Sequence, residues 1–518
     1  MKKLSTLLIM AFALVLGLTQ CKKKNVDTIA TPNNLGEAVY ITVNVGGDKH
    51  TVNPGTGEVN FENGDEIYVG NGGHYIGTLT YDGSAFSGII NGPSTADYLH
   101  FYFVGGLTPS ATPEAGTTTD FTVSIANQSS KLPVLSYGRS TDKYTTSSAT
   151  YDCTLANKCG LVKFVPATAT SEPVRVHGMK TTATINFATP GITPTNATGT
   201  IALYPENDEA KWAILLPQAE VSTPDGMIGK YGCTMSKVPE VTENMYYTSV
   251  NMDAYKPGML GGLFTINPGG GKVHFSQGNL QAVGTATSSP TSGWTWSFAT
   301  NQYDYIGAAA ANTSISGNGT VSADGTVDLF GWSTATTYYG INDSKNNDDY
   351  SGDFKDWGGT IGNTWRTLTS AEWAYLFNTR SNTTVNNVEN ARFTKTAITT
   401  PSSTTVNGLI IFPDSYSGGT PSGVTWGTIN GTSDGYTTTC TADGWAALEA
   451  AGCVFLPAAG RRLGAAVNNV GSNGYYWSST ANSASDAYDV YFRSNLFNLS
   501  DVSNRYFGYS VRLVIACE

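Results

Sequence analysis

The segment HYIGTLTYDGSAFSGII (His74–Ile90) alternates apolar and polar residues on both sides of an Asp-Gly dipeptide. A period of two places successive side chains on opposite faces of a strand, and Asp-Gly is a common two-residue hairpin turn. Similar short runs surround it, from AVYITVNVGG (Ala38–Gly47) to YLHFYFVGG (Tyr98–Gly106), and they break at Gly or Asn-Gly. The pattern predicts antiparallel strands that pack as a β-sandwich without long helices.

A second set of short strands follows a polar stretch at residues 136–150. It runs from CGLVKFVP (Cys159–Pro166) to WAILLPQ (Trp212–Gln218). A chain of 518 residues is long enough for roughly two to four domains. We therefore predict two all-β sandwiches, followed by a Pro- and Gly-rich linker. The predicted bounds are residues 36–148 and 149–255 for the sandwiches and 256–261 for the linker.

The composition is typical of a β-rich protein outside the cytoplasm. Charged residues make up only 13% of the chain, whereas 40% of residues are hydrophobic, which is enough to fill real cores. The formal net charge is -11, and Lys and Arg form no stripe. Because a nucleic-acid surface needs clustered positive charge, we expect no nucleic-acid partner.

The first residues have the pattern of a secretion signal. Two Lys precede the apolar run Leu4–Leu18, which is too short for a good membrane span. Cys21 follows in Leu-Thr-Gln-Cys, which resembles a bacterial lipobox and implies lipidation of Cys21; an ordinary signal peptide is the alternative. We predict a lipoprotein signal peptide at residues 1–21, a polar tether at residues 22–35 and an outer-membrane anchor.

The cysteines after Cys21 leave two interpretations open. Cys153 and Cys159 flank a short segment that fits a hairpin tip, and Cys440 and Cys453 bracket a predicted helix. An extracytoplasmic compartment permits disulfides, but spacing does not fix their connectivity. Buried, unpaired thiols explain the same residues.

The remainder of the chain, residues 262–518, contains nearly all of the Trp residues and two predicted helices. In TLTSAEWAYLFNTR, Thr369 stands three residues before Glu372, which is the spacing of a capping box. The second helix, TADGWAALEAAG, ends at Gly452. Two helices among Gly-punctuated strands predict an α+β domain.

Both β-rich blocks resemble the fimbrillin-type pilus proteins of the Bacteroidota. The resemblance is carried by NGDEIYV with GTLTYDGSAFSG, and by CTLANKCGLVKFVP leading to GTIALYPENDEAKWAILLPQ. It implies two transthyretin-like β-sandwiches in a lipoprotein precursor that exchanges a strand with other pilin subunits after proteolysis at a basic residue. Lys49 is the only Lys or Arg between Lys24 and Lys131, so we expect processing there. A pair of generic secreted sandwiches is the alternative.

A series of motifs in residues 262–518 carries a second resemblance. They are, in order, GGKVHFSQGNLQ, WSFATNQYDYIG, DLFGWST, WRTLTSAEWAYLFNTR, GLIIFPDSY, FLPAAGRR, GYYWSST and GYSVRLV. The series is similar to the C-type-lectin-like domain shared by formylglycine-generating-enzyme-like proteins and the phage major tropism determinant. The paired active-site cysteines of those enzymes have no counterpart, because Cys453 and Cys517 lie outside the motif.

Few residues favour catalysis or a bound metal. No His follows His274, so the long segment after it cannot supply a Ser-His-Asp site, a Cys-His site or a His-ligated metal. We therefore predict that the protein is not an enzyme and needs no cofactor. One acidic loop, NDSKNNDDYSGDFKDWGG, could hold a structural Ca²⁺, which takes six to eight oxygen ligands, or could simply be solvated. Its carboxylates are Asp343, Asp348, Asp349, Asp353 and Asp356.

The segment YFRSNLFNLSDVSNRYFGYSVRLV (Tyr491–Val514) reads as a polar, aromatic loop followed by a strand, Tyr509–Val514. Tyr gives large contact area with little entropy to lose, and Ser and Asn adapt their hydrogen bonds, so such loops suit recognition. Arg493 and Arg505 add planar donors, whereas Trp477, Val511, Leu513 and Val514 are assigned to packing. The predicted ligand-binding residues are Tyr475, Tyr476, Tyr488, Tyr491, Arg493, Asn495, Phe497, Asn498, Ser500, Asp501, Ser503, Asn504, Tyr506 and Phe507.

One compositional feature of this segment indicates diversification. Between Ser478 and Ala516 there is no Lys, Met, Trp, Gln or Glu. These are the residues that an Asn codon ending in a pyrimidine cannot reach when its adenines are replaced. Diversity-generating retroelements replace adenines in this way, and major-tropism-determinant-like domains are among their targets. A locally polar loop of low charge explains the same absence.

These observations predict a cell-surface lipoprotein adhesin in the outer membrane that acts as a pilus tip subunit. Its partners would be other pilin subunits and a host or bacterial surface protein or glycan. A structural pilus or anchor subunit that binds no ligand is the main alternative. A carbohydrate-active enzyme is more remote.

Overall fold

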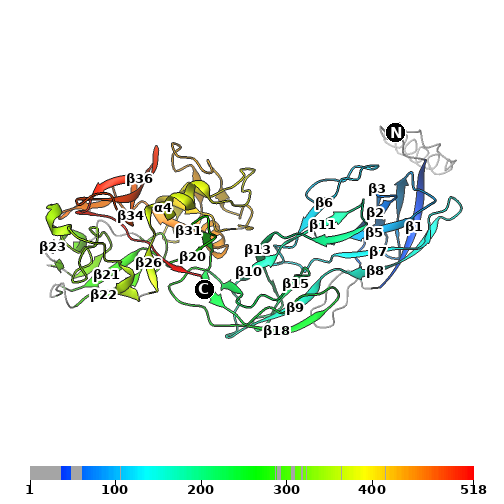
Figure 1. The fold of residues 1–518 in the computed structure, drawn as a ribbon, viewed down its shortest axis with the longest axis horizontal. Coiled ribbons are helices and arrows are strands. Elements are labelled where there is room, and N and C mark those ends of the chain that lie inside the picture. The colour runs from blue at the N-terminus through cyan, green and yellow to red at the C-terminus, as the bar shows by residue number, and fades with distance from the viewer. Residues whose placement is uncertain are drawn as a thin grey trace, which may run out of the picture.

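The computed structural model describes residues 37–47 and 61–517, apart from short gaps at 106, 286–287, 289–292, 305–309, 317–318, 322–323, 363 and 415. The molecule is elongated and predominantly β, with two lobes that meet at a narrow junction (Figure 1). Strands β1 to β18 build the first lobe, and the elements from β19 onward build the second. None of the described helices is long and apolar enough to cross a membrane.

The first lobe begins with a closed barrel in the strand order β1-β4-β3-β2-β5-β7-β8. The hairpin predicted at Asp82-Gly83 is confirmed, because Tyr81 pairs with Phe86 across the turn and Gly83 has a φ of 100°. Strand β8 begins at Thr150, so the barrel extends past the boundary predicted at residue 148. The strands are β1 (Ala38–Gly47), β2 (Glu66–Asn71), β3 (His74–Tyr81), β4 (Phe86–Asn91), β5 (Tyr98–Phe103), β7 (Ser136–Lys143) and β8 (Thr150–Asn157).

The two predicted sandwiches share one hydrophobic core. A single cluster of buried apolar side chains runs from Ile41 to Met252, and β6 (Phe121–Ser124) pairs with β11 (Thr182–Asn186) across the predicted boundary. The division at residue 148 therefore does not separate two cores. The other strands are β9 (Gly160–Pro166), β10 (Val174–Lys180), β12 (Gly191–Pro194), β13 (Thr198–Ala202), β14 (Tyr204–Pro205), β15 (Lys211–Leu215), β16 (Asp225–Ile228), β17 (Tyr231–Thr234) and β18 (Tyr246–Met252).

Both predicted helices of the second lobe are confirmed. The Thr369 hydroxyl accepts a hydrogen bond from the backbone N–H of Glu372, and the Glu372 carboxylate accepts one from the backbone N–H of Thr369, which completes the capping box of α4 (Ser370–Ala374). The other helix is α5 (Ala442–Ala450), after which Gly452 has a φ of 89°. The remaining helices are α2 (Ala310–Thr313), η2 (Asn347–Tyr350), α3 (Gly358–Ile361) and η3 (Tyr375–Thr379).

The base of the second lobe is a sheet in the order β19-β20-β38-β26. The last strand, β38 (Leu513–Ala516), is thus paired on both sides, and the C-terminus lies at the junction with the first lobe (Figure 1). The strands before it are β19 (Phe264–Thr265), β20 (Lys272–Phe275), β21 (Leu280–Gly284), β22 (Thr295–Phe298), β23 (Ile315–Ser316), β24 (Thr320–Val321), β25 (Gly325–Val327), β26 (Trp365–Thr367), β27 (Phe393–Thr399), β28 (Thr405–Ile411), β29 (Val424–Thr425), β30 (Thr438–Cys440), β31 (Val454–Pro457), β32 (Arg461–Leu463), β33 (Ala466–Asn468), β34 (Asn473–Ala481), β35 (Asp486–Arg493), β36 (Leu496–Asn504) and β37 (Phe507–Gly508).

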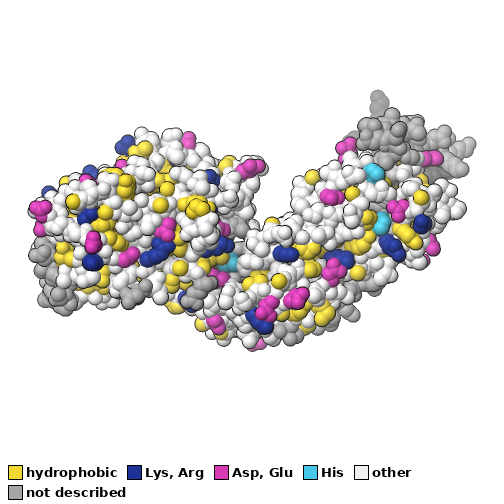
Figure 2. Space-filling model, in the orientation of Figure 1, with side chains coloured by type: hydrophobic (Ala, Val, Ile, Leu, Met, Phe, Trp, Pro, Cys, Tyr) yellow, Lys and Arg dark blue, Asp and Glu magenta, His cyan; other side chains and the backbone are white. Residues whose placement is uncertain are grey.

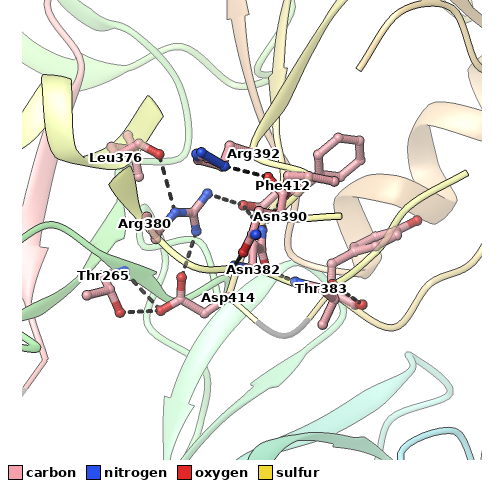
Figure 3. Close-up of polar contacts among 11 residues, drawn as sticks. Thr265, Leu376, Arg380, Asn382, Thr383, Asn390, Arg392, Phe412 and Asp414 are labelled. Atoms are coloured by element: carbon pink, nitrogen blue, oxygen red, sulfur yellow. Dashed lines mark hydrogen bonds and ion pairs between the residues drawn. The ribbon is translucent and has the colours of Figure 1, made fainter. Parts of the chain in front are cut away.

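A buried arginine ties three segments of this lobe together (Figure 3). Arg380 follows η3 and is 1% exposed. Its Nη1 donates to Asp414 Oδ1 at 2.7 Å, and its Nη2 donates to the Phe412 carbonyl at 2.7 Å. Asp414 Oδ2 in turn accepts from the backbone N–H and the hydroxyl of Thr265 in β19, at 2.9 and 2.6 Å. The network fixes β19 to η3 and to the segment after β28.

The cysteines of the described chain are free thiols. Cys153, Cys159, Cys233, Cys440 and Cys453 are buried, and Cys517 is half-buried. Of the two interpretations of the spacing, the structure contains the unpaired thiols. Burial raises the pKa of Cys153, Cys233 and Cys440 to about 12, so these thiols are unreactive at neutral pH.

Candidate binding surface

The segment predicted as a polar loop, residues 491–508, instead forms the end of β35 and all of β36 and β37. Strands β34, β35 and β36 make an antiparallel sheet in the second lobe (Figure 1). The interpretation of residues 491–508 as loop is wrong because both faces of this sheet carry aromatic and polar residues, which hides the alternation of a strand. The final strand was also misplaced, since β38 begins at Leu513 rather than at Tyr509. Trp477, Val511, Leu513 and Val514 are buried, as predicted.

One face of the sheet packs against α4 and η3. Phe377 from η3 lies 4.9 Å from Phe497 in β36, measured between ring centroids, and Tyr476, Val490 and Phe492 belong to the same buried cluster. The Tyr476 hydroxyl donates to the Pro457 carbonyl at 2.8 Å. Tyr476 and Phe497 were predicted to contact a ligand, but they are core residues that anchor the sheet.

The opposite face carries a row of stacked rings, which we call the aromatic row: Phe507, Tyr509, Tyr475 and Tyr491. Successive ring centroids are 5.9, 4.7 and 4.7 Å apart, and the ring planes differ by 10°, 16° and 5°. Tyr475 and Tyr509 are buried, whereas Phe507 and Tyr491 at the two ends are half-buried. The prediction that Tyr475 faces a ligand is therefore wrong, because its ring is covered on both sides.

Polar groups border the aromatic row at both ends. The Asn473 amide donates to the Tyr491 hydroxyl at 3.2 Å, and the neighbouring Asn498 amide donates to Asp501 Oδ1 at 3.0 Å. At the other end, the Arg461 guanidinium lies 4.9 Å from the centroid of the Phe507 ring, which is a cation–π arrangement. The row thus combines ring surface with amide, carboxylate and guanidinium groups.

The remaining predicted residues divide between surface and interior. Arg493, Asn495 and Ser500 are exposed, and Tyr488, Asn498, Asp501, Asn504 and Tyr506 are half-buried. Ser503 is buried and accepts a hydrogen bond from the Tyr509 hydroxyl at 2.8 Å, so its predicted binding role is wrong. Arg505 is also buried: its guanidinium stacks over Trp332 and donates to backbone carbonyls, which makes it structural.

A carboxylate is buried beneath this surface. Asp489 pairs across the sheet with Asp501, is 1% exposed, and neither of its oxygens has a hydrogen-bond partner of normal geometry. Burial, followed by the charge of Asp501, raises the pKa of Asp489 well above its usual range, although the nearby Ser503 hydroxyl opposes the shift. Burial also raises the pKa of Asp501. The pair favours a neutral carboxylic acid at position 489.

From the buried carboxyl group of Asp489 we predict that the second lobe is more stable in mild acid than at neutral pH. Because the pKa of Asp489 is raised on folding, its contribution to stability is complete below the unfolded pKa of about 3.9 and declines as the pH rises toward the folded value. Asp489→Asn should remove that decline and raise the free energy of unfolding at neutral pH by about 1–3 kcal/mol. Thermal midpoints measured from pH 4 to 8 test this, with the exposed Asp353→Asn as control. An unchanged pH profile in Asp489→Asn would contradict it.

The acidic loop does not form a compact cation site. The Asp356 carboxylate accepts hydrogen bonds from the backbone N–H groups of Gly358 and Thr367, and Asp349 accepts from the Ser344 hydroxyl. Within the described part of the chain, the loop's carboxylates do not converge as a group of three donors. The geometry gives no support to a calcium site there.

A group that the sequence analysis missed lies at the junction. Asp225 Oδ2 and His274 Nε2 are 2.8 Å apart, and Cys517 Sγ completes a set of donor atoms within 4.8 Å of one another. Burial lowers the pKa of His274, but hydrogen bonds and charges from Asp225 and Cys517 outweigh burial and raise the pKa to about 10. The three residues come from β16, β20 and the segment after β38, and no spacing in the sequence relates them.

Two predicted residues, Cys21 and Lys49, lie outside the described residues, as do the signal peptide and the tether. Strand β1, just before Lys49, is described: it lies between β4 and β8, with Ile41 and Val43 fully buried. On the face shown in Figure 2, charged side chains of both signs are scattered over both lobes.

Comparison with known proteins finds similarity to solved structures alone. No protein-family model matches the chain, and neither does any curated protein. A candidate cell adhesion protein from Bacteroides uniformis is 17% identical, covers 42% of this chain and 96% of its own, and has a TM-score of 0.30. A fimbrial protein from Bacteroides ovatus is 12% identical, covers 93% of this chain and 100% of its own, and has a TM-score of 0.23. A fimbrial anchor protein from Porphyromonas gingivalis is 8% identical, covers 38% and 77%, and has a TM-score of 0.24.

Proposed function

We propose that this protein is a cell-surface lipoprotein adhesin at the tip of a pilus. Its second lobe, a C-type-lectin-like domain by the resemblance of its motifs, binds a protein or glycan through the β34-β35-β36 sheet. Binding involves recognition and no chemical step. The observation that carries the proposal is the aromatic row, whose half-buried ends, Tyr491 and Phe507, are bordered by hydrogen-bonding groups.

The physical reason is preorganisation. A ligand gains most from rings and amides that are already held in place, because little conformational entropy is then lost on binding. Packing of Phe497 against Phe377 fixes the back of the sheet, and stacking of Tyr475 fixes Tyr491 at the front. The residues that reach the surface from this frame are Tyr488, Tyr491, Arg493, Asn495, Asn498, Ser500, Asp501, Asn504, Tyr506 and Phe507.

A variant of four residues that reach the surface tests the binding role. The combined change Tyr491→Ala, Arg493→Ala, Asn498→Ala and Tyr506→Ala should abolish capture on a glycan array and on intact host or bacterial cells. A central hot-spot side chain is worth about 2 kcal/mol or more, which is roughly 30-fold in Kd. Surface positions away from the core usually shift stability by only about 0.5 kcal/mol each, so the variant should still fold, with a further modest loss from the ring contacts of the half-buried Tyr491 and Tyr506.

The matched control carries Tyr246→Ala and Tyr255→Ala, which remove exposed tyrosines from the first lobe. This control should bind like the wild type. If the four-residue variant folds and still captures every partner of the wild type, the binding surface lies elsewhere. If it unfolds, the four substituted side chains have a structural role, like the buried side chains of Tyr475, Tyr476, Phe497 and Ser503. That outcome would favour a structural pilus or anchor subunit.

Assembly would use β1. We propose that proteolysis after Lys49 releases this strand, and that a strand from another pilin subunit replaces it between β4 and β8. The backbone groups freed along both neighbours would pair with the incoming strand, and the sites of Ile41 and Val43 would receive its side chains. Strand β38 is paired on both sides, so it is not available for donation to a further subunit.

The position proposed for this subunit is a pilus end. Immunogold labelling of the second lobe should mark fibre tips, and Lys49→Gln should leave the protein uncut and absent from fibres. Label along the whole shaft would contradict the tip position. The lipid anchor at Cys21 and diversification by a retroelement belong to the same proposal; a neighbouring reverse-transcriptase gene with a template repeat would support the latter.

A further inference from the structure

We infer that Asp225, His274 and Cys517 form a binding site for a zinc-class divalent metal ion at the junction of the two lobes. Their donor atoms, a carboxylate oxygen, an imidazole nitrogen and a thiol sulfur, lie within 4.8 Å of one another. Imidazole, thiolate and carboxylate are the ligands that Zn²⁺ takes in proteins, and a site with three protein ligands leaves a fourth position for water or another group.

The outer contacts of the ligands orient them toward a common point. His274 Nδ1 lies 3.1 Å from the Gly262 carbonyl, which directs Nε2 toward Asp225. Asp225 Oδ1 accepts from the backbone N–H of Gly226 at 2.8 Å, which directs Oδ2 toward His274. The backbone N–H of Cys517 donates to the Lys272 carbonyl at 3.0 Å and holds the chain end against β20. Metal-ligating histidines and carboxylates are held by contacts of this kind.

The separation of Asp225 and His274 needs only a small adjustment to hold the ion. Zn–N and Zn–O bonds of about 2.1 Å in a tetrahedral site place the donor atoms about 3.4 Å apart. The observed separation of 2.8 Å between Asp225 Oδ2 and His274 Nε2 is that of a direct ion pair. The two atoms must therefore move apart by about 0.6 Å, which is within the reach of a χ rotation of the partly exposed Asp225.

Such an ion would join the lobes. Asp225 belongs to β16 of the first lobe, whereas His274 and Cys517 belong to the base sheet of the second, and Figure 1 places the C-terminus at this junction. Other polar contacts across the junction include Lys230 with Glu449 at 3.4 Å, His177 Nε2 with the Gly261 carbonyl at 2.9 Å, and Arg175 with the Ala450 carbonyl. A metal bound by both sides would restrict bending between the lobes.

Cobalt substitution tests the site in the full mature chain. Titration with Co²⁺ should give one equivalent bound, with a thiolate-to-cobalt charge-transfer band and visible bands of tetrahedral intensity; Zn²⁺ should displace it and raise the thermal midpoint. Cys517→Ser should abolish the charge-transfer band and weaken binding at least tenfold. Because Cys517 is half-buried and follows the last strand, this variant should fold like the wild type.

Two further variants make the result decisive. His274→Gln should also lose the bound ion, and Asp348→Asn in the acidic loop should bind like the wild type, since that loop is not part of the site. The inference is overturned if Co²⁺ binds without a charge-transfer band, if the band survives in Cys517→Ser, or if no stoichiometric binding is found. Each of these outcomes would leave Asp225 and His274 as a plain ion pair.

Discussion

Arg380→Met is expected to lower the free energy of unfolding of the second lobe by about 3–5 kcal/mol, because it leaves the half-buried carboxylate of Asp414 without its charge partner. Arg380 is 1% exposed and donates to Asp414 and to the carbonyls of Phe412 and Leu376, so three acceptor groups lose this donor together (Figure 3). Urea unfolding monitored by Trp fluorescence measures the loss, since nearly all Trp residues lie in this lobe.

The double variant Arg380→Met with Asp414→Leu separates charge from packing. It removes both charges, so it should be less destabilised than Arg380→Met alone, although Thr265 then loses its acceptor. If Arg380→Met proves as stable as the wild type, the network does not hold β19 to η3. If the double variant is worse than the single one, the side-chain volumes matter more than the buried charge.

Trp477→Ala should cost a similar amount, about 3–5 kcal/mol, because it leaves a large cavity beneath the β34-β35-β36 sheet. The ring is 1% exposed, its centroid lies 4.5 Å from that of the tilted Tyr509 ring, and its Nε1 donates to the Phe330 carbonyl at 2.7 Å. Trp477→Phe is the matched control: it keeps most of the ring volume and loses mainly the hydrogen bond, for about 1 kcal/mol or somewhat more. Equal losses in the two variants would show that the hydrogen bond, not the volume, dominates.

Features with a local cause could be predicted from the sequence. The Asp82-Gly83 turn needs only its own two residues and the alternation beside them, and the capping box of α4 needs only Thr369 and Glu372. Gly452 ends α5 for the same kind of reason, because glycine adopts the positive φ found there. In these cases the residues that decide the structure are neighbours in the chain.

The candidate binding surface depends on neighbours that are distant in the chain. Tyr476 and Tyr488 have the same chemistry, yet α4 and β31 cover the first and leave the second half-exposed. Ser500 is exposed and Ser503 is buried because only the latter lies beneath Tyr509. The cluster of Asp225, His274 and Cys517 at the junction depends most strongly on distant neighbours, since Asp225 and Cys517 meet only after both lobes have folded.

The shared core of the first lobe has a consequence for a subunit that has lost β1. Ile41 and Val43 do not form a separate small core. They belong to one apolar cluster that continues to Met252. A lobe with a single core behaves as one cooperative folding unit, so removal of β1 at one end lowers the stability of the whole lobe. A processed subunit without its donor strand would therefore be more flexible throughout the first lobe. Binding of the donor strand would both join two subunits and make the connection to the second lobe more rigid.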